Sequence, residues 1–341
     1  MLNLIISPFF KVIKARSGFT KASPQGLSRL LSTVSAITFI AGTYASADVP
    51  KVVADIAPIH SLVSRVMDGV GEPKLIVPNE TSPHDYRLRP ADAEAIENAN
   101  LVFWMGEGLT PWMERALEAL SNDTDIIEFL ALEESTLLSF REGALFEAHD
   151  HSDHDDHDKD HDDHDDHDDH AGHDHGEYDP HAWLSTNNAK TWLNVIAARL
   201  SSIDPDNAGA YFANASEARG EMDALDVEIN TMLDPVRGGN FVVFHDAYQY
   251  FETVYDFPAS GAISLGDASD PSAARVAEIA NRIKSENIAC VLSEPQFNAG
   301  LVKTVMGGTD ATTEVIDPLG FGIEPGKSLY PKLIRAMAQS L

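Results

Sequence analysis

From about residue 51 onward, short apolar runs alternate with amphipathic helical runs, and this alternation limits the fold more than any other feature. Strands separated by helices of about ten residues are typical of βαβ units and parallel sheets. The expected strands are residues 51–56, 74–77, 101–104, 125–129, 241–244, 262–264, 288–293 and 313–316. The expected helices are residues 59–67, 90–99, 112–120, 187–200, 206–233, 247–255, 271–284, 299–306 and one from Leu329.

The helical stretch at residues 206–233 divides this pattern into two similar halves. Pro205 and Pro235 bound it, as expected for residues that begin and end a helix. Its apolar positions, Val227 among them, are only loosely periodic, and its length of roughly 40 Å exceeds what one lobe needs. We therefore expect an α/β fold in which one long rigid helix joins two βα lobes with mainly parallel sheets, and small lobe motions. The expected division is 48–204 for the first lobe, 205–235 for the linking helix and 236–341 for the second lobe.

Residues 1–47 differ in composition from the rest of the chain. They contain five basic residues and no acidic one, followed by an apolar stretch at 30–41 and the sequence Ala45-Ser46-Ala47. A positive region, a short apolar region and an A-x-A site predict a cleavable signal peptide. The apolar stretch is too short for a membrane span. We expect a mature chain that starts at Asp48 and lies in the periplasm.

A run of histidine and aspartate at residues 149–175 interrupts the first lobe and carries ten of the 14 histidines. Its charges repel one another and it has no apolar residue larger than alanine, so it cannot form a core. Imidazoles and carboxylates at this density favour Zn²⁺ and similar divalent metals, and we expect an accessory metal-binding loop at about 147–177. The histidines are His149, His151, His154, His157, His161, His164, His167, His170, His173 and His175.

The net charge of −30 argues against a nucleic-acid partner. Cys290 is the only cysteine, so the chain cannot form an internal disulfide.

Four histidines lie outside this run: His60, His84, His181 and His245. The last three stand in loops where a strand has ended or structure resumes, and Asp317 follows the last expected strand in the same way. Parallel sheets bind ligands at the carboxyl ends of their strands, so these four side chains could converge between the lobes. His60, at a helix start, is interpreted as a polar loop or capping residue.

Three imidazoles completed by an oxygen ligand or water form a good tetrahedral shell for Zn²⁺. The ligand imidazoles must be neutral, so acid should release the metal. Asp85 and Asp246, each adjacent to a candidate ligand, could orient the rings from outside the shell.

Five short motifs in this order closely resemble the metal receptors of bacterial ABC importers, best of all the zinc-specific periplasmic receptors of the ZnuA type. The resemblance covers nearly all of the chain from about residue 51. The motifs are PHDYRLRP (83–90), PHAWLS (180–185), FHDAY (244–248), SEPQF (293–297) and DPLG (317–320).

This resemblance implies two βα lobes joined by a long helix, with metal held between them by His84, His181 and His245. Manganese members of the family place a carboxylate at the position of His245, so histidine there favours zinc. Some zinc members carry glutamate just before the first ligand, where this chain has Pro83. The fourth ligand is then Asp317 or water, and we favour Asp317.

The sequence therefore predicts a periplasmic receptor that captures Zn²⁺ and delivers it to an inner-membrane zinc ABC permease. We expect a monomer and no enzymatic activity, with a periplasmic zinc chaperone as a further candidate partner. Receptors for other divalent metals such as manganese or nickel, and a zinc buffer or storage protein based on the loop, are the alternatives. A zinc hydrolase would need a catalytic motif, and the sequence has no H-E-x-x-H.

Overall fold

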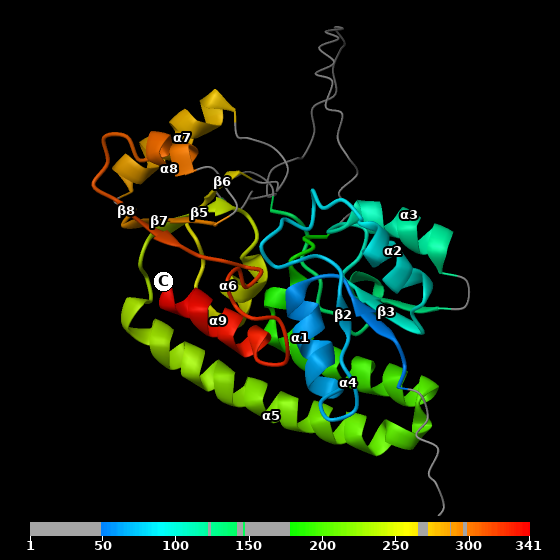
Figure 1. Cartoon of the computed structure of the whole chain (residues 1–341). Coiled ribbons are helices and arrows are strands. Elements are labelled where there is room, and N and C mark those ends of the chain that lie inside the picture. Colours follow the sequence, from blue (N-terminus) through cyan, green and yellow to red (C-terminus); the bar gives the residue numbers. More distant parts are fainter. Residues whose placement is uncertain are drawn as a thin grey trace, which may run out of the picture. The chain divides into compact units, whose positions relative to one another are not determined.

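Two four-stranded parallel sheets form the frame of the protein (Figure 1). The structure, a computed structural model, describes residues 49–121, 124–141, 146, 178–264, 272–286, 288–295 and 299–341. The first sheet consists of β1 (Val52–Ala54), β2 (Lys74–Leu75), β3 (Leu101–Trp104) and β4 (Asp125–Glu128). The second consists of β5 (Phe241–His245), β6 (Ala262–Ser264), β7 (Cys290–Ser293) and β8 (Thr312–Val315).

The two sheets have the same topology. Their strand orders are β2-β1-β3-β4 and β6-β5-β7-β8, and every pair is parallel. In each half, the chain first adds a strand on one side of the starting strand and then crosses to its other side. The predicted fold class, two βα lobes with parallel sheets, is confirmed.

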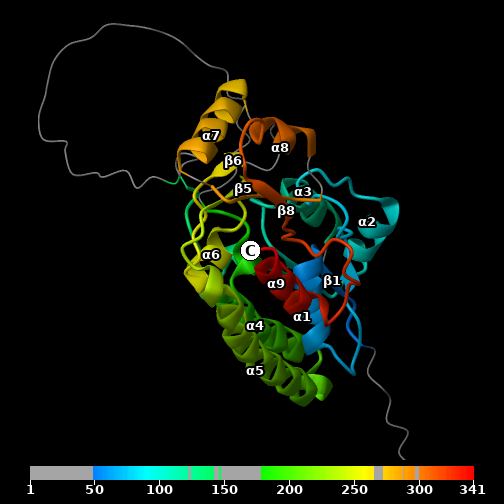
Figure 2. The same cartoon turned by 90° about the vertical axis from the view of Figure 1, so that its left-hand side faces the viewer.

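The described helices follow the predicted alternation closely. The long helix α5 packs beside α4, as both ribbon views show (Figure 2). The remaining helices lie between or after the strands in chain order. The α-helices are α1 (Ala57–Val66), α2 (Pro90–Glu97), α3 (Pro111–Leu120), α4 (Thr186–Ile203), α5 (Ala208–Leu233), α6 (Gln249–Tyr255), α7 (Ala273–Ser285), α8 (Ala299–Val305) and α9 (Leu329–Gln339).

Helix α5 owes its position to a stripe of buried residues at spacings of three or four. Such spacing places the side chains on one face of a helix of 3.6 residues per turn. Val227 falls outside the stripe and is 68% exposed, so it does not belong to the packing face. The buried residues are Tyr211, Ala215, Ala218, Met222, Leu225, Ile229 and Leu233.

The second sheet separates two hydrophobic clusters. Alternate residues of a strand point to opposite faces. Thus Val243 belongs to the large core that extends through both halves, whereas Val242 and Phe244 pack with Ile279 and Ile283 of α7 in a smaller cluster.

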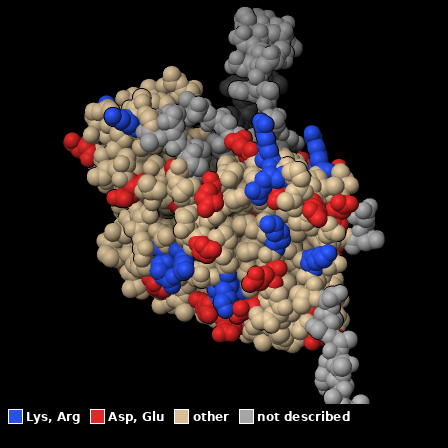
Figure 3. All heavy atoms as spheres, in the orientation of Figure 1, with Lys and Arg blue, Asp and Glu red and all other residues tan. Residues whose placement is uncertain are grey.

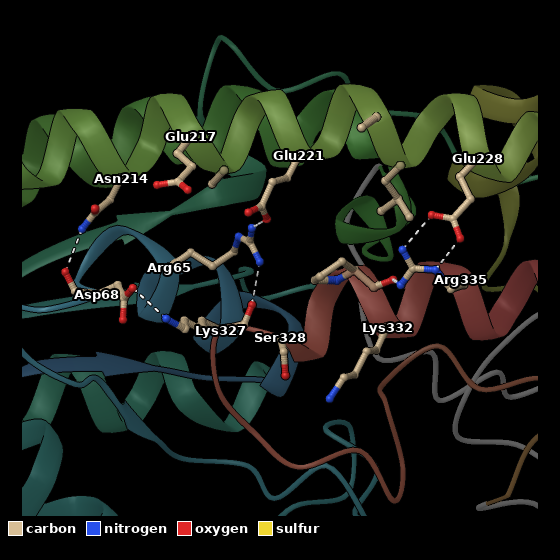
Figure 4. A pocket seen from close by; sticks show the side chains of 14 residues that line it. Arg65, Asp68, Asn214, Glu217, Glu221, Glu228, Lys327, Ser328, Lys332 and Arg335 are labelled. Atoms are coloured by element: carbon tan, nitrogen blue, oxygen red, sulfur yellow. Dashed lines mark hydrogen bonds and ion pairs between the residues drawn. The ribbon is translucent and has the colours of Figure 1, made fainter.

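The C-terminal helix α9 packs against α5 and α1. A pocket of about 570 Å³ lies along this junction and is lined by paired charges (Figure 4). Arg335 binds Glu228 through two nitrogens, at 2.6 and 2.7 Å, and Arg65 binds Glu221 and the carbonyl oxygen of Lys327. These contacts join the first helix, the long helix and the chain's last helix.

Acidic and basic side chains intermingle on the face drawn in Figure 3. Among the described helices, none is both long and apolar enough to cross a membrane. The predicted signal peptide at 1–47 and the ten histidines at 149–175 lie outside the described residues.

Candidate metal centre

His245 lies at the point in the second sheet where the order of strand addition changes direction. His245 is the last residue of β5, and β5 lies between β6 and β7. In such sheets, ligands bind in the crevice at the carboxyl ends of the two strands where the order switches. Glu294 directly follows β7 across this crevice, and its Oε1 lies 2.8 Å from Nδ1 of His245. Both side chains are almost fully buried.

His181 is held by a short turn that begins at Asp179. One oxygen of Asp179, Oδ1, accepts the backbone N–H of His181 at 2.9 Å and lies 2.7 Å from Nδ1 of its ring. A carboxylate at Nδ1 of His181 or His245 favours the tautomer in which Nδ1–H donates, so Nε2 carries the lone pair that a metal needs.

His84 lies in a loop that is fixed on both sides. The indole of Trp112 in α3 donates to the carbonyl oxygen of Pro83 at 2.8 Å. Tyr86 donates its hydroxyl to Asp92 Oδ2 in α2 at 2.5 Å and packs against the Trp112 ring. The half-buried His84 is therefore presented by the first lobe from a loop without regular structure.

The three rings come together although they are far apart in the chain. The ring centroids of His84 and His181 are 6.1 Å apart, and those of His181 and His245 are 5.0 Å apart. Two imidazoles bound to one tetrahedral zinc through bonds of about 2.0–2.1 Å have centroids roughly 5 Å apart. Among the described residues, no three His, Cys, Asp or Glu side chains already form a coordinating group, so the rings lie at nearly the required separation without a closed shell.

Asp317 lies in a loop joined to both lobes. Its Oδ1 accepts the backbone N–H of Leu319 at 2.9 Å. The adjacent Pro318 accepts the indole N–H of Trp183, two residues beyond His181, at 2.8 Å. Burial raises the pKa of Asp317; hydrogen bonds from backbone N–H groups oppose this shift, and the nearby charge of Glu294 adds to it. Asp317 is thus close enough to sense the carboxylate that supports His245.

Comparison with known proteins identifies the family of the chain. The family model for the periplasmic zinc-uptake complex component A, ZnuA, matches residues 52–341. The chain belongs to the ZnuA family. The high-affinity zinc uptake system protein ZnuA of Brucella abortus is 45% identical over 328 residues, covering 92% of this chain and 98% of that protein. The ZnuA of Paracoccus denitrificans is 43% identical, covering 87% and 92%.

Solved structures share the fold of this ZnuA family member. A crystal structure of ZnuA superposes with a TM-score of 0.67 at 23% identity, covering 86% of this chain and 99% of that chain. A zinc-bound ZnuA deletion mutant gives 0.66, also at 23% identity, covering 86% and 96%. A manganese-bound periplasmic protein from Candidatus Liberibacter asiaticus gives 0.65 at 21% identity, covering 85% and 97%. At these identities the structures support the fold alone.

The carboxylates that orient the rings are not those expected from the sequence. Asp179 and Glu294 hold His181 and His245, whereas Asp85 is exposed and Asp246 binds Arg141. Sequence adjacency misled the prediction because a side chain next to a ligand usually points away from its ring. Asp179 could have been found because it lies two residues before His181. Glu294 could have been found because it directly follows the expected strand 288–293.

His60 takes a structural position within α1. Its Nε2 lies 3.1 Å from the carbonyl oxygen of Pro73, and its Nδ1 lies 3.5 Å from Ser64 Oγ. Burial lowers the pKa of His60. These contacts tie α1 to the segment before β2 and account for a histidine that the ZnuA site does not need.

Proposed function

We propose that this ZnuA family member captures Zn²⁺ between its two lobes with His84, His181 and His245, and delivers it to the inner-membrane permease of a zinc ABC importer. Asp317 is proposed as the fourth ligand, because it is half-buried beside the same loops and interacts with Glu294. Zinc is the cargo of this site, and the chain catalyses no reaction on it.

One observation carries this proposal: the His181 ring lies 5.0 Å from the His245 ring and 6.1 Å from the His84 ring, centroid to centroid, close to the separation of roughly 5 Å that a shared tetrahedral zinc imposes. Two of them are also supported at Nδ1 by buried carboxylates. This support is the arrangement that orients metal-binding histidines in proteins.

The donor set favours zinc over the alternative cargo metals. Three nitrogen donors with one carboxylate suit Zn²⁺, whereas Mn²⁺ prefers mainly oxygen ligands. Ni²⁺ is the closer competitor, because imidazole also suits nickel.

We further propose how the remaining segments serve this role. Residues 1–47 act as a cleaved signal peptide, and residues 48–204 and 236–341 form the two lobes on either side of the linking helix at 205–235. The His/Asp-rich loop collects zinc at weaker accessory sites for transfer to the main site. The receptor works as a monomer, and a periplasmic zinc chaperone is a candidate donor to it.

A competitive zinc titration tests the ligand set. The mature chain with residues 148–176 deleted should retain one tight site, and His84→Ala or His245→Ala in this background should remove it. His60→Ala is the matched control and should bind zinc like the parent. Loss of the tight site on deleting residues 148–176 would instead assign capture to the loop, as in a buffering protein.

A further inference from the structure

Arg141 forms a buried ionic contact next to the proposed metal centre. It lies in the extended segment after the 3-10 turn Phe129–Ala131, and its side chain is only 15% exposed. The guanidinium binds Asp246 through two nitrogens, one of them at 3.0 Å, and Glu252 of α6 at 2.8 and 3.1 Å. The Phe146 ring covers one face of the guanidinium, with its centroid 3.5 Å from Cζ.

These partners place Arg141 against the residue that follows a proposed ligand. Asp246 is next to His245, and its backbone N–H bonds to Ser264 of the neighbouring strand at 3.1 Å. Fixing both the backbone and the carboxylate of Asp246 restricts the direction in which the His245 side chain leaves β5. Arg141 therefore acts on the ring from one residue away, in addition to the direct support from Glu294.

The segment that carries Arg141 also holds the support of His181. The backbone N–H of Asp179 donates to the carbonyl oxygen of Leu138 at 2.9 Å. The Tyr250 hydroxyl of α6 accepts from the backbone N–H of Leu138 at 2.9 Å and donates to the carbonyl oxygen of Asp179 at 2.8 Å. Residues 138–141 thus contact the residue that supports His181 and the residue that adjoins His245.

Charge balance makes this arrangement sensitive to Arg141. The guanidinium is shared by two carboxylates, Asp246 and Glu252. Burial raises the pKa of Asp246, and the nearby negative charges of Asp179 and Glu252 raise it further. Burial lowers the pKa of Arg141, but hydrogen bonds to Glu252 and Asp246 outweigh it and raise that pKa, so the side chain stays charged. A guanidinium can bind two carboxylates in one plane, which the ammonium of lysine cannot reproduce.

We propose that Arg141 is a positioning residue for zinc capture, which holds the ring of His245 in register with that of His181 by joining Asp246 to the segment that supports Asp179. This inference rests on the proposed ligand set, and its test must separate the two.

A positioning role and a purely electrostatic role of Arg141 predict opposite changes in zinc affinity when Arg141 is replaced. A positive charge near a dication opposes its binding, so removing that charge should tighten zinc binding if charge alone matters. Loss of positioning should instead weaken binding, because residues that orient metal ligands from outside the shell typically contribute 10–100-fold in affinity.

The experiment measures the zinc dissociation constant of the mature chain by competition, with the visible absorption of bound Co²⁺ as a report on coordination geometry. Arg141→Met should weaken zinc binding by about 10–100-fold and alter the Co²⁺ spectrum. Arg141→Lys, which keeps the charge and loses the planar contact, should recover only part of this loss. It also provides the measurement if Arg141→Met does not fold.

Arg65→Met is the matched control. The Arg65 side chain is also only 10% exposed, and it binds Glu221 and the carbonyl oxygen of Lys327 in the pocket along α5 and α9. The Arg65→Met variant should have a lower melting temperature than the parent and the same zinc dissociation constant. Equal or tighter zinc binding in Arg141→Met, or an equal weakening in Arg65→Met, would overturn the proposal.

His245→Ala distinguishes an error in the proposed ligand set from an error in the positioning role of Arg141. If it removes tight binding while Arg141→Met binds like the parent, the ligand set stands and the positioning role is wrong. If His245→Ala binds zinc normally, the ligand set itself is wrong, and the role of Arg141 is wrong with it.

Discussion

The two sheets have the same strand order but use their carboxyl edges differently. In the first sheet the crevice between β1 and β3 is closed by Asp55, which is fully buried. Its two oxygens accept the backbone N–H groups of Ile56 and Met105, each at 2.7 Å. In the second sheet the corresponding crevice between β5 and β7 holds the pair formed by His245 and Glu294.

The difference shows that strand topology sets where a binding site can form. The side chain at that position then decides whether the sheet edge joins two strands or can hold a ligand. A carboxylate whose oxygens both bind backbone groups joins two strands and leaves little capacity for a ligand. An imidazole supported at Nδ1 keeps Nε2 for a metal. In the proposed site, the first lobe therefore provides His84 and His181 from loops, and the second lobe provides His245 from a strand end.

The largest effect should come from His245→Ala. Loss of a direct ligand should weaken zinc binding by more than the roughly 100-fold upper range for residues outside the shell. Zinc in excess should raise the melting temperature of the parent, since binding stabilises only the folded state, and this shift should disappear in the variant. Calorimetry with and without a chelator measures it, and Asp55→Asn should retain the zinc-dependent shift.

Glu294→Gln should weaken zinc binding by about 10–100-fold. The amide keeps an acceptor for Nδ1 of His245 but loses the charge that makes the ring a better ligand. Competitive titration measures the change, and unaltered affinity would mean that Glu294 contributes only to packing.

In contrast to Glu294→Gln, Asp55→Asn should lower the free energy of unfolding and leave zinc binding unchanged. The amide offers one acceptor where the carboxylate offers two, so either Ile56 or Met105 keeps a buried unpaired N–H, at a cost of about 1–3 kcal/mol. Urea unfolding of the zinc-free chain gives this value. A change in zinc affinity would show that the two edges are coupled more directly than their contacts indicate.

The smallest expected effect is the pH dependence that Asp55 adds to folding. Burial outweighs its backbone hydrogen bonds and raises the pKa of Asp55 to about 7. Because the folded-state pKa lies above the unfolded one, the stabilisation is complete below the unfolded pKa and is lost as pH rises through 7. Relative to Asp55→Asn, the parent should lose about 1 kcal/mol between pH 6 and pH 8. Equal pH profiles of the two zinc-free chains would contradict this.

Local patterns were enough to predict the order and type of the elements. Apolar runs and helix-bounding prolines located the eight strands of the described residues and the long helix α5, with ends that coincide or differ by at most two residues. The packing face of α5 was harder to predict, because Val227 is apolar and yet exposed. Intrinsic hydrophobicity does not reveal which face a neighbour covers.

The candidate site could be predicted only in part, for a physical reason. His84, His181 and His245 stand beside strand ends or helix starts, which a linear pattern can reveal. Glu294 meets His245 because β7 lies next to β5, although β6 comes between them in the chain. Arg141 reaches Asp246 from more than 100 residues away. Such contacts follow from strand order and packing, which spacing in the sequence does not encode.

The position of α9 bears on the order in which the chain can fold. Leu329, Tyr330 and Leu333 are fully buried against elements that include α1 and α5, and the Tyr330 hydroxyl donates to the carbonyl oxygen of Trp183 at 2.8 Å. Until α9 has docked, this apolar surface therefore stays exposed. Consolidation of the first lobe, and of the turn that carries His181, depends on a helix that follows it by more than 100 residues, so the proposed site is expected to become competent for metal only after the second half of the chain has folded.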